Sequence, residues 1–198
     1  MQVVEDQVLI RALWGDQPPR TAGNTLQVHV SRLRALLGAP QAVQRRSHGY
    51  LLDVRPTDVD AEIFEGLLSS ARGHCQMDEF AHAEDLVRQC LVLWRGTPFL
   101  GVDEPEVAAR RARLEEQRMI ARELATACRI RLADDDYARD LAVADAQGLF
   151  ALAPDRPRSR ELLAEALDLA GRQSQARQVR QDSAMPEGEG PRKGALGA

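Results

Sequence analysis

The chain changes its pattern of apolar residues near residue 57, and this change constrains the fold more than any other feature. Beyond that point, apolar side chains recur at helical spacing over almost the whole remaining sequence. The pattern predicts helices at 60–72, 78–95, 106–132, 137–152, 158–170 and 173–181. Because the turns between them are short and polar, we expect antiparallel pairs stacked as a helical-repeat domain, with repeats too degenerate to count.

The first 56 residues follow a different pattern. Apolar residues at helical spacing predict a helix from Val3 to Gly15, and the prolines of Gln17-Pro18-Pro19 cannot continue it. A second helix is expected to begin near Thr21 or Asn24, both good N-caps, and to end at Gly38. Two helices joined by a proline turn are typical of a helix-turn-helix.

Two short extended runs follow the second helix. Val43–Ser47 and Tyr50–Val54 flank His48-Gly49, which predicts a β-hairpin with the glycine in its turn. Arg45 and Arg46 lie on the first strand. The predicted fold class is therefore mainly α, with a winged helix-turn-helix and its C-terminal hairpin preceding the helical domain.

The second predicted helix has two chemically distinct faces. Its apolar stripe, with steps of four, three and four residues, consists of Leu26, Val30, Leu33 and Leu37. The opposite polar face consists of Asn24, Gln27, Ser31 and Arg34, with Arg32 on its flank. Amide, hydroxyl and guanidinium groups are those that read base edges in a major groove or bind phosphates. The alternative interpretation is a solvated amphipathic helix followed by an unrelated hairpin.

The distribution of charge favours the DNA-binding interpretation. The net charge of the whole chain is −4, but residues 1–56 hold seven arginines and four acids, a balance of +3 that leaves −7 for the rest. No acid lies between Asp16 and Asp53. The arginines within that interval are Arg20, Arg32, Arg34, Arg45 and Arg46. A small basic segment joined to a larger acidic one indicates that the basic part faces a polyanion.

Other function classes find little support in the sequence. No run approaches the roughly 20 apolar residues of a membrane-spanning helix, and the N-terminus lacks the features of a secretory signal. Three widely spaced cysteines, Cys75, Cys90 and Cys128, predict no disulfide framework, which fits a reducing cytoplasm. No paired metal-ligand spacing, phosphate-binding glycine loop or nucleophile arrangement is present in the sequence, so no enzyme activity, cofactor or metal is expected.

Two acidic groups receive structural interpretations. The triplet Asp134-Asp135-Asp136 lies at a helix junction, where carboxylates cap the following N-terminus. A solvated helix face is expected for Glu104, Glu106, Glu115 and Glu116.

The first 56 residues resemble a known regulator family. Residues 12–19, Ala-Leu-Trp-Gly-Asp-Gln-Pro-Pro, and residues 24–34, Asn-Thr-Leu-Gln-Val-His-Val-Ser-Arg-Leu-Arg, are similar to the signature of the Streptomyces antibiotic regulatory proteins. Residues 48–54, His-Gly-Tyr-Leu-Leu-Asp-Val, are similar to the wing of that family. The resemblance implies an OmpR-type winged helix in a transcription activator.

The second part resembles the bacterial transcriptional activator domain, a tetratricopeptide-like helical domain. The segments that carry the resemblance are 59–64, Leu93-Trp94-Arg95-Gly96, Asp103-Glu104-Pro105, Arg113-Leu114-Glu115-Glu116 and 170–173. The sequence thus predicts a DNA-binding domain at 1–56, an activator domain at 57–183 and a disordered tail at 184–198, rich in glycine, proline and charge.

The resemblance also implies that both domains are incomplete. Such a winged helix begins with an antiparallel sheet and a first helix, and Met1-Gln2-Val3-Val4 corresponds to the end of that helix or to the residues just beyond it. We therefore expect the apolar stripe of the second helix to lose part of its cover. At the other end the family continues with further helices, so the helical domain is expected to lack its terminal cap.

The expected DNA-binding residues lie on the second helix and the hairpin. Base-edge contacts are expected from Gln27, Ser31 and Arg34, and phosphate contacts from Asn24, Thr25 and Arg32, with Arg20 and Thr21 just before the helix. On the hairpin, Arg45, Arg46 and His48 are expected to reach the backbone or the minor groove.

The resemblance further implies a cytoplasmic, nucleoid-associated activator of an antibiotic gene cluster. It would bind promoter direct repeats as a homodimer on double-stranded DNA, contact RNA polymerase holoenzyme and have no membrane partner. The alternative is a helical-repeat interaction scaffold whose truncated winged helix no longer binds DNA.

Overall fold

The computed structural model describes residues 3–102 and 104–181 of the chain. It divides into two compact units, one formed by residues up to 63 with 98–111, the other by residues 64–97 with those from 112 onward. The described part contains eight α-helices and one small sheet, which confirms the predicted mainly helical class. None of its helices is long and apolar enough to cross a membrane. The predicted tail, 184–198, lies outside the described residues.

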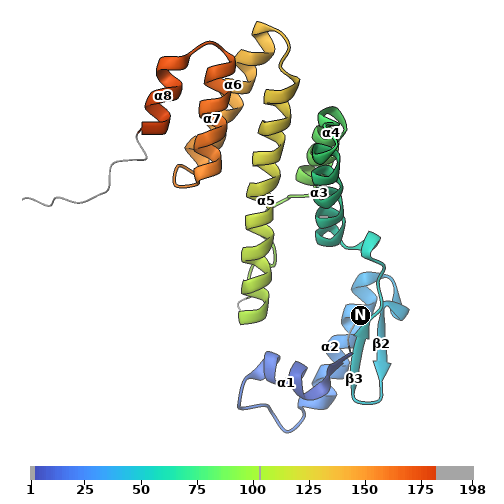
Figure 1. Cartoon of the computed structure of the whole chain (residues 1–198). Helices are drawn as coiled ribbons and strands as arrows, with labels where there is room; N and C mark the ends of the chain where they lie inside the picture. Colours follow the sequence, from blue (N-terminus) through green and yellow to red (C-terminus); the bar gives the residue numbers. More distant parts are fainter. Residues whose placement is uncertain (1–2, 103, 182–198) are drawn as a thin grey trace, which may run out of the picture. The chain divides into compact units, whose positions relative to one another are not determined.

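A three-stranded antiparallel sheet organises the first unit (Figure 1). Its strands are β1 (Val3–Glu5), β2 (Val43–Arg46) and β3 (Gly49–Leu52), in the order β1-β3-β2. The prediction of a helix from residue 3 is therefore wrong for the first three residues. They extend because β3 offers them a free edge, and Val4 lies opposite Tyr50 in the resulting ladder.

Two helices pack against this sheet. α1 (Asp6–Trp14) begins with an acidic residue, favourable at a helix N-terminus, and ends where Gly15 takes a positive φ of 63°. After the proline turn, α2 (Ala22–Leu37) ends at Gly38, in the left-handed conformation at φ 61°. The predicted limits of the second helix, near Thr21 and Gly38, are confirmed.

The core of the first unit lies between α2 and the hairpin. Leu26 and Val30 of α2 are buried against Val43 of β2 and Tyr50 of β3, with Leu9, Ile10 and Trp14 of α1 packed around them. The second half of the predicted apolar stripe has less cover, because Leu33 is 43% and Leu37 is 48% exposed. The apolar stripe is thus only partly covered in the described structure.

Gly49 occupies a strand and not the hairpin turn, which is formed by Ser47 and His48. The glycine pairs with Arg46 on one side and Glu5 on the other. A Cβ at this position would lie 2.0 Å from the carbonyl oxygen of Val4. The expectation that this glycine serves the turn is therefore wrong. It is required because the backbone of β1 approaches too closely for any side chain.

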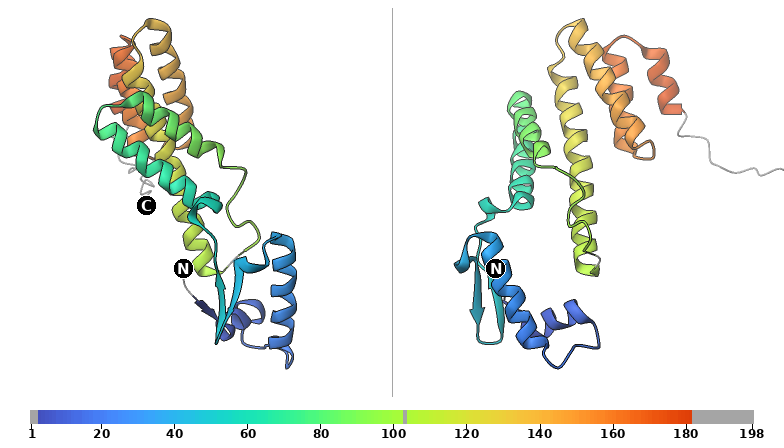
Figure 2. Two further views of the ribbon diagram at one scale, coloured as in Figure 1. Left: turned by 90° about the vertical axis from the view of Figure 1, so that its right-hand side faces the viewer. Right: turned by 180° about the vertical axis from the view of Figure 1, so that it is seen from behind.

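Six helices follow along the chain (Figures 1 and 2). They are α3 (Asp60–Gln76), α4 (Phe80–Val92), α5 (Pro105–Leu132), α6 (Asp136–Leu152), α7 (Pro157–Leu169) and α8 (Gln173–Gln181). All six predicted helices are confirmed, with shifts only at their ends. In the second unit, α7 packs between α6 and α8, and a shared core of alanine, leucine and valine residues joins these helices.

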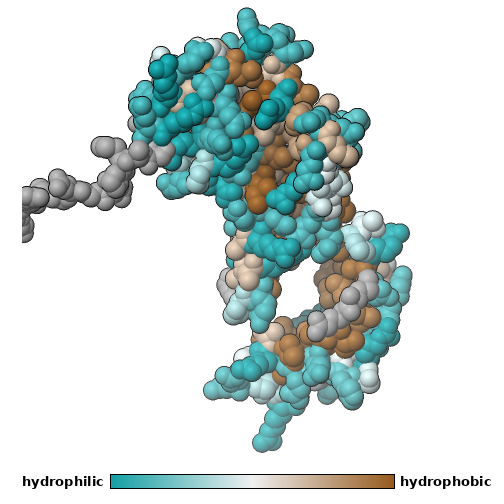
Figure 3. Space-filling view, in the orientation of Figure 1, coloured by the Kyte–Doolittle hydropathy of each residue, from teal (hydrophilic) through white to brown (hydrophobic). Residues whose placement is uncertain are grey.

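Small residues are buried in α3, α4 and α5, and an aromatic contact joins α3 to the segment after α4. Ala71, Ala83 and Ala121, one from each helix, are completely buried. Phe64 meets the ring of Trp94 edge-on at 5.5 Å, and the guanidinium of Arg118 lies 4.6 Å from the centre of the same indole. Figure 3 shows hydrophobic residues gathered in a stripe on the visible face of the helical part, with hydrophilic residues over most of the rest of that face.

The acidic triplet before α6 has the predicted capping role. The side chain of Asp135 accepts a hydrogen bond of 2.7 Å from the backbone N–H of Ala138, in the N-cap position. Its neighbour Asp136 lies in the first helical turn and pairs with Arg139. The triplet therefore starts a helix.

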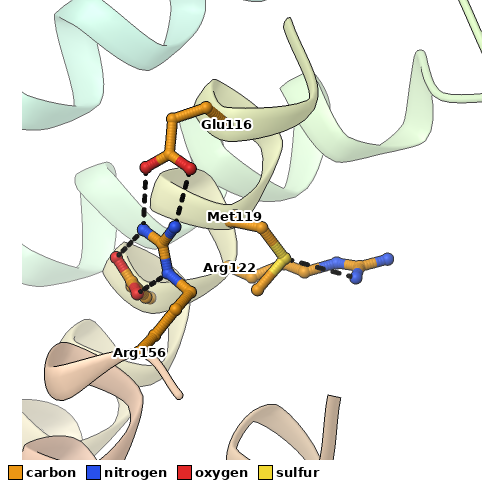
Figure 4. A network of polar contacts seen from close by, with 5 residues as sticks. Glu116, Met119, Arg122 and Arg156 are labelled. Carbon is orange, nitrogen blue, oxygen red and sulfur yellow. Dashed lines mark hydrogen bonds and ion pairs between the residues drawn. The ribbon is translucent and has the colours of Figure 1, made fainter. Parts of the chain in front are cut away.

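Arg156, just before α7, binds two carboxylates of α5 at once (Figure 4). Its Nη atoms donate to both oxygens of Glu116 at 2.6 and 2.9 Å, and its Nε donates to Glu123 at 2.7 Å. These hydrogen bonds lower the pKa of Glu116 and raise the pKa of the arginine. Glu123 is only 7% exposed. Glu116 is exposed, as expected for a solvated helix face, but it also has a partner that lies 40 residues further along the chain.

We expect Gly49→Ala to destabilise the first unit by about 1–3 kcal/mol, because a backbone carbonyl cannot move aside for the new methyl group. The matched control is Gly23→Ala in α2, where nothing lies within 4 Å of the added Cβ and alanine favours the helix. Thermal unfolding followed by circular dichroism measures both variants. Equal melting temperatures for the two would contradict the close approach of β1.

We expect Arg156→Gln to destabilise the second unit by about 3 kcal/mol, because the buried carboxylate of Glu123 loses its counter-charge. Restoring neutrality with the additional change Glu123→Gln should recover part of that loss. The control is Arg88→Gln, which removes an exposed pair with Asp85 and should leave stability almost unchanged. Urea unfolding curves give the three free energies, and an equal loss in both single variants would refute this role.

The ion pair between Arg156 and Glu116 makes the stability of the protein depend on pH. Because the pKa of Glu116 is lowered by Arg156, its contribution to stability is complete above the unfolded-state pKa of a glutamate. It is lost as the pH falls through the lower folded-state value. Wild-type protein should therefore lose stability in acid more steeply than Glu116→Gln, a difference that urea unfolding at pH 6 and at stepwise lower pH measures.

Candidate nucleic-acid interface

The two faces of α2 have different environments. Ala22, Leu26 and Val30 are buried, and the last two form the core with the hairpin. This packing fixes the rotation of the helix about its axis. Consequently the residues on the opposite side, at helical spacing, must point away from the sheet.

The outward face of α2 carries polar side chains without partners in the described part of the chain. Asn24, Gln27, Ser31 and Arg32 are all exposed, and none makes a side-chain hydrogen bond or ion pair with another described residue. Just before the helix, Arg20 and Thr21 are exposed as well. An aligned row of amide, hydroxyl and guanidinium groups on one helix face has the chemistry for base edges and phosphates.

Arg34 is placed differently from the other polar residues of α2. Its Nε and Nη2 donate to the backbone carbonyl oxygen of Val43 at 2.8 and 2.6 Å, and the side chain is half-buried. Arg34 follows buried Val30 by four residues and so lies beside the apolar stripe. The guanidinium thus joins the C-terminal half of α2 to β2. Thr25 also bonds internally, through its hydroxyl to the Thr21 carbonyl.

On the hairpin, Arg45 is held by neighbours within the unit. Its two terminal nitrogens donate to the two oxygens of Asp6 at 2.6 and 2.7 Å, and its guanidinium lies 4.7 Å from the ring centre of Tyr50. The hydrogen bonds that it donates to Asp6 raise the pKa of this arginine. The pair joins the start of α1 to β2 in a two-pronged geometry typical of arginine and carboxylate.

Arg46 and His48 have exposed side chains that are available for contacts outside the unit. Both are exposed at the hairpin tip, and neither side chain makes a hydrogen bond or ion pair with residues 3–102 or 104–181. Among the predicted DNA-binding residues, the arginines without a partner in the described part of the chain are therefore Arg20, Arg32 and Arg46. His48 follows Arg46 by two residues.

Two contributors to this surface were missed by the sequence analysis. Asp6 orients Arg45, and the ring of Trp14 lies 6.3 Å from that of His29, which joins α1 to the exposed side of α2. Both pairs span helices or strands, so periodicity along one element gives no signal for them. Within the described residues, no group of three or more histidines, cysteines or acids is arranged to hold a metal ion.

Comparison with protein families matches both parts of the chain. Residues 59–183 match the bacterial transcriptional activator domain, and residues 1–52 match the C-terminal domain of transcriptional regulatory proteins. The first match covers more than half of the chain. The order of the two domains is the one that the resemblance implied.

Curated relatives are regulatory proteins of Streptomyces. The regulatory protein AfsR of Streptomyces coelicolor is 35% identical over 88% of this chain and 17% of its own length. DnrI of Streptomyces peucetius is 38% identical over 59% of the chain and 47% of its own length. The transcriptional regulator RedD of Streptomyces coelicolor is 33% identical over 85% of the chain and 49% of its own length. The chain thus spans less than half the length of these relatives.

A solved structure has the same fold. EmbR of Mycobacterium tuberculosis, determined in complex with a low-affinity phosphopeptide, aligns with a TM-score of 0.78 and 24% identity, over 92% of this chain and 50% of its own. At this identity the likeness concerns the fold. The matched domains and the curated relatives show that the chain belongs to the bacterial transcriptional activator domain family and, within it, to the Streptomyces antibiotic regulatory proteins.

Proposed function

We propose that the chain is a sequence-specific DNA-binding transcription activator of a secondary-metabolite gene cluster. The observation that carries the proposal is the outward face of α2, where Asn24, Gln27, Ser31 and Arg32 are exposed and have no partner among the described residues, while the opposite face is fixed on the sheet. A helix held in this way presents its polar row to a major groove. The relatives supply the context, since DnrI and RedD are named as a regulatory protein and a transcriptional regulator.

In this proposal the residues divide by chemistry. Gln27 and Ser31 read base edges, and Asn24, Thr25 and Arg32 bind phosphates, joined by Arg20 and Thr21 before the helix. Arg46 and His48 at the hairpin tip reach the DNA backbone or the adjacent minor groove. Arg45 supports them through its bonds to Asp6.

Arg34 receives a positioning role in the proposal. Two of its nitrogens are used on the Val43 carbonyl, so it sets the angle between α2 and the hairpin. A base contact by the same side chain would require those hydrogen bonds to break.

The wider assignments follow from the domain order. The DNA-binding domain extends over 1–56 and the activator domain over 57–183, a division supported by the two matched ranges. Two copies bind adjacent direct repeats in a promoter, and the helical domain contacts RNA polymerase holoenzyme. The site of action is the nucleoid in the cytoplasm. No enzymatic step is assigned to the chain.

The first experiment is fluorescence anisotropy of the chain with duplex DNA from upstream of its own gene cluster, over a series of salt concentrations. We expect specific binding whose affinity falls steeply with salt, because arginines displace counterions from phosphates. If the chain unfolds cooperatively but binds no DNA even at low salt, the helical-repeat scaffold becomes the better interpretation.

Removing a phosphate contact should change the salt dependence. We expect Arg46→Gln to weaken binding to all duplexes alike and to reduce the slope of log affinity against log salt by about one. The matched control is Arg72→Gln on α3, an exposed arginine outside the interface, which removes the same charge. Equal slopes of log affinity against log salt for the two variants would show that Arg46 does not contact a phosphate.

Specificity should reside in α2. We expect Gln27→Ala to lose about 1–3 kcal/mol of discrimination at one base pair and to leave binding to unrelated DNA unchanged. Arg34→Ala should instead lower the melting temperature and weaken binding to all duplexes together. Competition with single-base variants of the bound duplex distinguishes the two, and relaxed specificity at one base pair in Arg34→Ala would assign that residue to a base.

A further inference from the structure

Two cysteines that are distant in the sequence meet inside the second unit. The Sγ atoms of Cys75, in the last turn of α3, and Cys128, in α5, lie 3.4 Å apart and share a hydrogen bond. The residues are 53 positions apart in the chain, and both are free thiols. The fold therefore places two thiols in contact that the sequence spacing gave no reason to connect.

The two thiols differ in access. Cys75 is half-buried near the end of its helix, whereas Cys128 is completely buried among small residues of α5. Burial, followed by the hydrogen bond with Cys75, raises the pKa of Cys128 to about 12. Cys128 therefore keeps its proton at neutral pH, and an oxidant from solvent meets Cys75 first.

We propose that Cys75 and Cys128 form a reversible intramolecular disulfide when the protein meets a peroxide. Hydrogen peroxide oxidises the Cys75 thiol to a sulfenic acid and releases one water. The Cys128 sulfur then attacks the Cys75 sulfur, the S–O bond breaks, and a second water leaves with the Cys128 proton. The sum is two thiols and one peroxide giving one disulfide and two waters.

The geometry requires only a small movement. A disulfide bond is about 2.05 Å long, so the sulfurs must approach by about 1.4 Å from their present contact. Cys75 precedes the last residue of α3, and the following Asp78 already has a positive φ of 59°. The backbone at the end of a helix can shift more easily than the backbone in its middle. Such a shift, with rotation of the cysteine side chains, brings the two sulfurs to bonding distance.

Cys90 offers an internal comparison. It is also completely buried, but its thiol donates to the carbonyl oxygen of Val87 in its own helix at 3.2 Å. Burial raises its pKa to about 11. With no sulfur as its partner, this third cysteine has no route to the same product.

The test treats the full chain with hydrogen peroxide, blocks the remaining thiols after unfolding, and maps the peptides. Trypsin places the three cysteines on separate peptides, 73–88, 89–95 and 123–129. We expect one linked species, 73–88 with 123–129, which a dithiol reductant separates, while the peptide 89–95 keeps a free thiol. Three free thiols after treatment, a link between two copies of 73–88, or oxidation of Cys75 to a sulfinic acid without a link would overturn the proposal.

Variants and unfolding give a second readout. Because the link closes a long loop between α3 and α5, oxidation should raise the melting temperature of the wild type by about 5 °C or more. Cys75→Ser should remove both the linked peptide and this shift, and Cys90→Ala should retain both. The wild-type peptide map needs no variant to fold. A melting temperature unchanged by oxidation, or a shift that persists in Cys75→Ser, would refute the disulfide between these helices.

Discussion

The packing of α2 on the hairpin is the interaction on which the first unit depends. Leu26 and Val30 fix which side of the helix faces the sheet, and Arg34 ties its later half to the Val43 carbonyl. Neither contact reads DNA, yet each determines the direction in which Gln27 and Ser31 point. A surface that recognises a ligand needs exposed side chains on a backbone that is held in place. In α2 the buried face holds the backbone and the opposite face exposes the side chains.

β1 and Gly49 fix the other side of the sheet. The strand pairs with β3 only because position 49 has no Cβ, and α1 starts directly after that strand. Asp6, the first residue of α1, then reaches Arg45 on the far strand. The strand β2 is thus held twice: by α2 through Arg34 and by the start of α1 through an ion pair.

The sequence predicted most of the helices and little of how they are joined. Periodic apolar residues and Pro or Gly breakers placed α6, α7 and α8 within a residue or so of their ends. The three residues of β1 are too few to show a period, and their partner strand lies more than 40 residues later. The polar face of α2 was predicted from its spacing, but the partners of Arg34 and Arg45 depend on tertiary contacts that no single element reveals. The assignment of those residues to DNA stays a prediction.

In the second unit, polar contacts link the helices in addition to the apolar core. Arg156 joins the start of α7 to α5 through Glu116 and Glu123, and Arg129 of α5 binds Glu84 of α4 and Asp145 of α6. Each arginine satisfies two carboxylates, so a single side chain connects elements that are distant in sequence. Such bonds are directional and fix the angle between helices, which apolar packing of alanines alone leaves less defined. The thiol contact between α3 and α5 lies in the same unit, and a covalent bond there would add a further constraint between two helices that are distant in sequence.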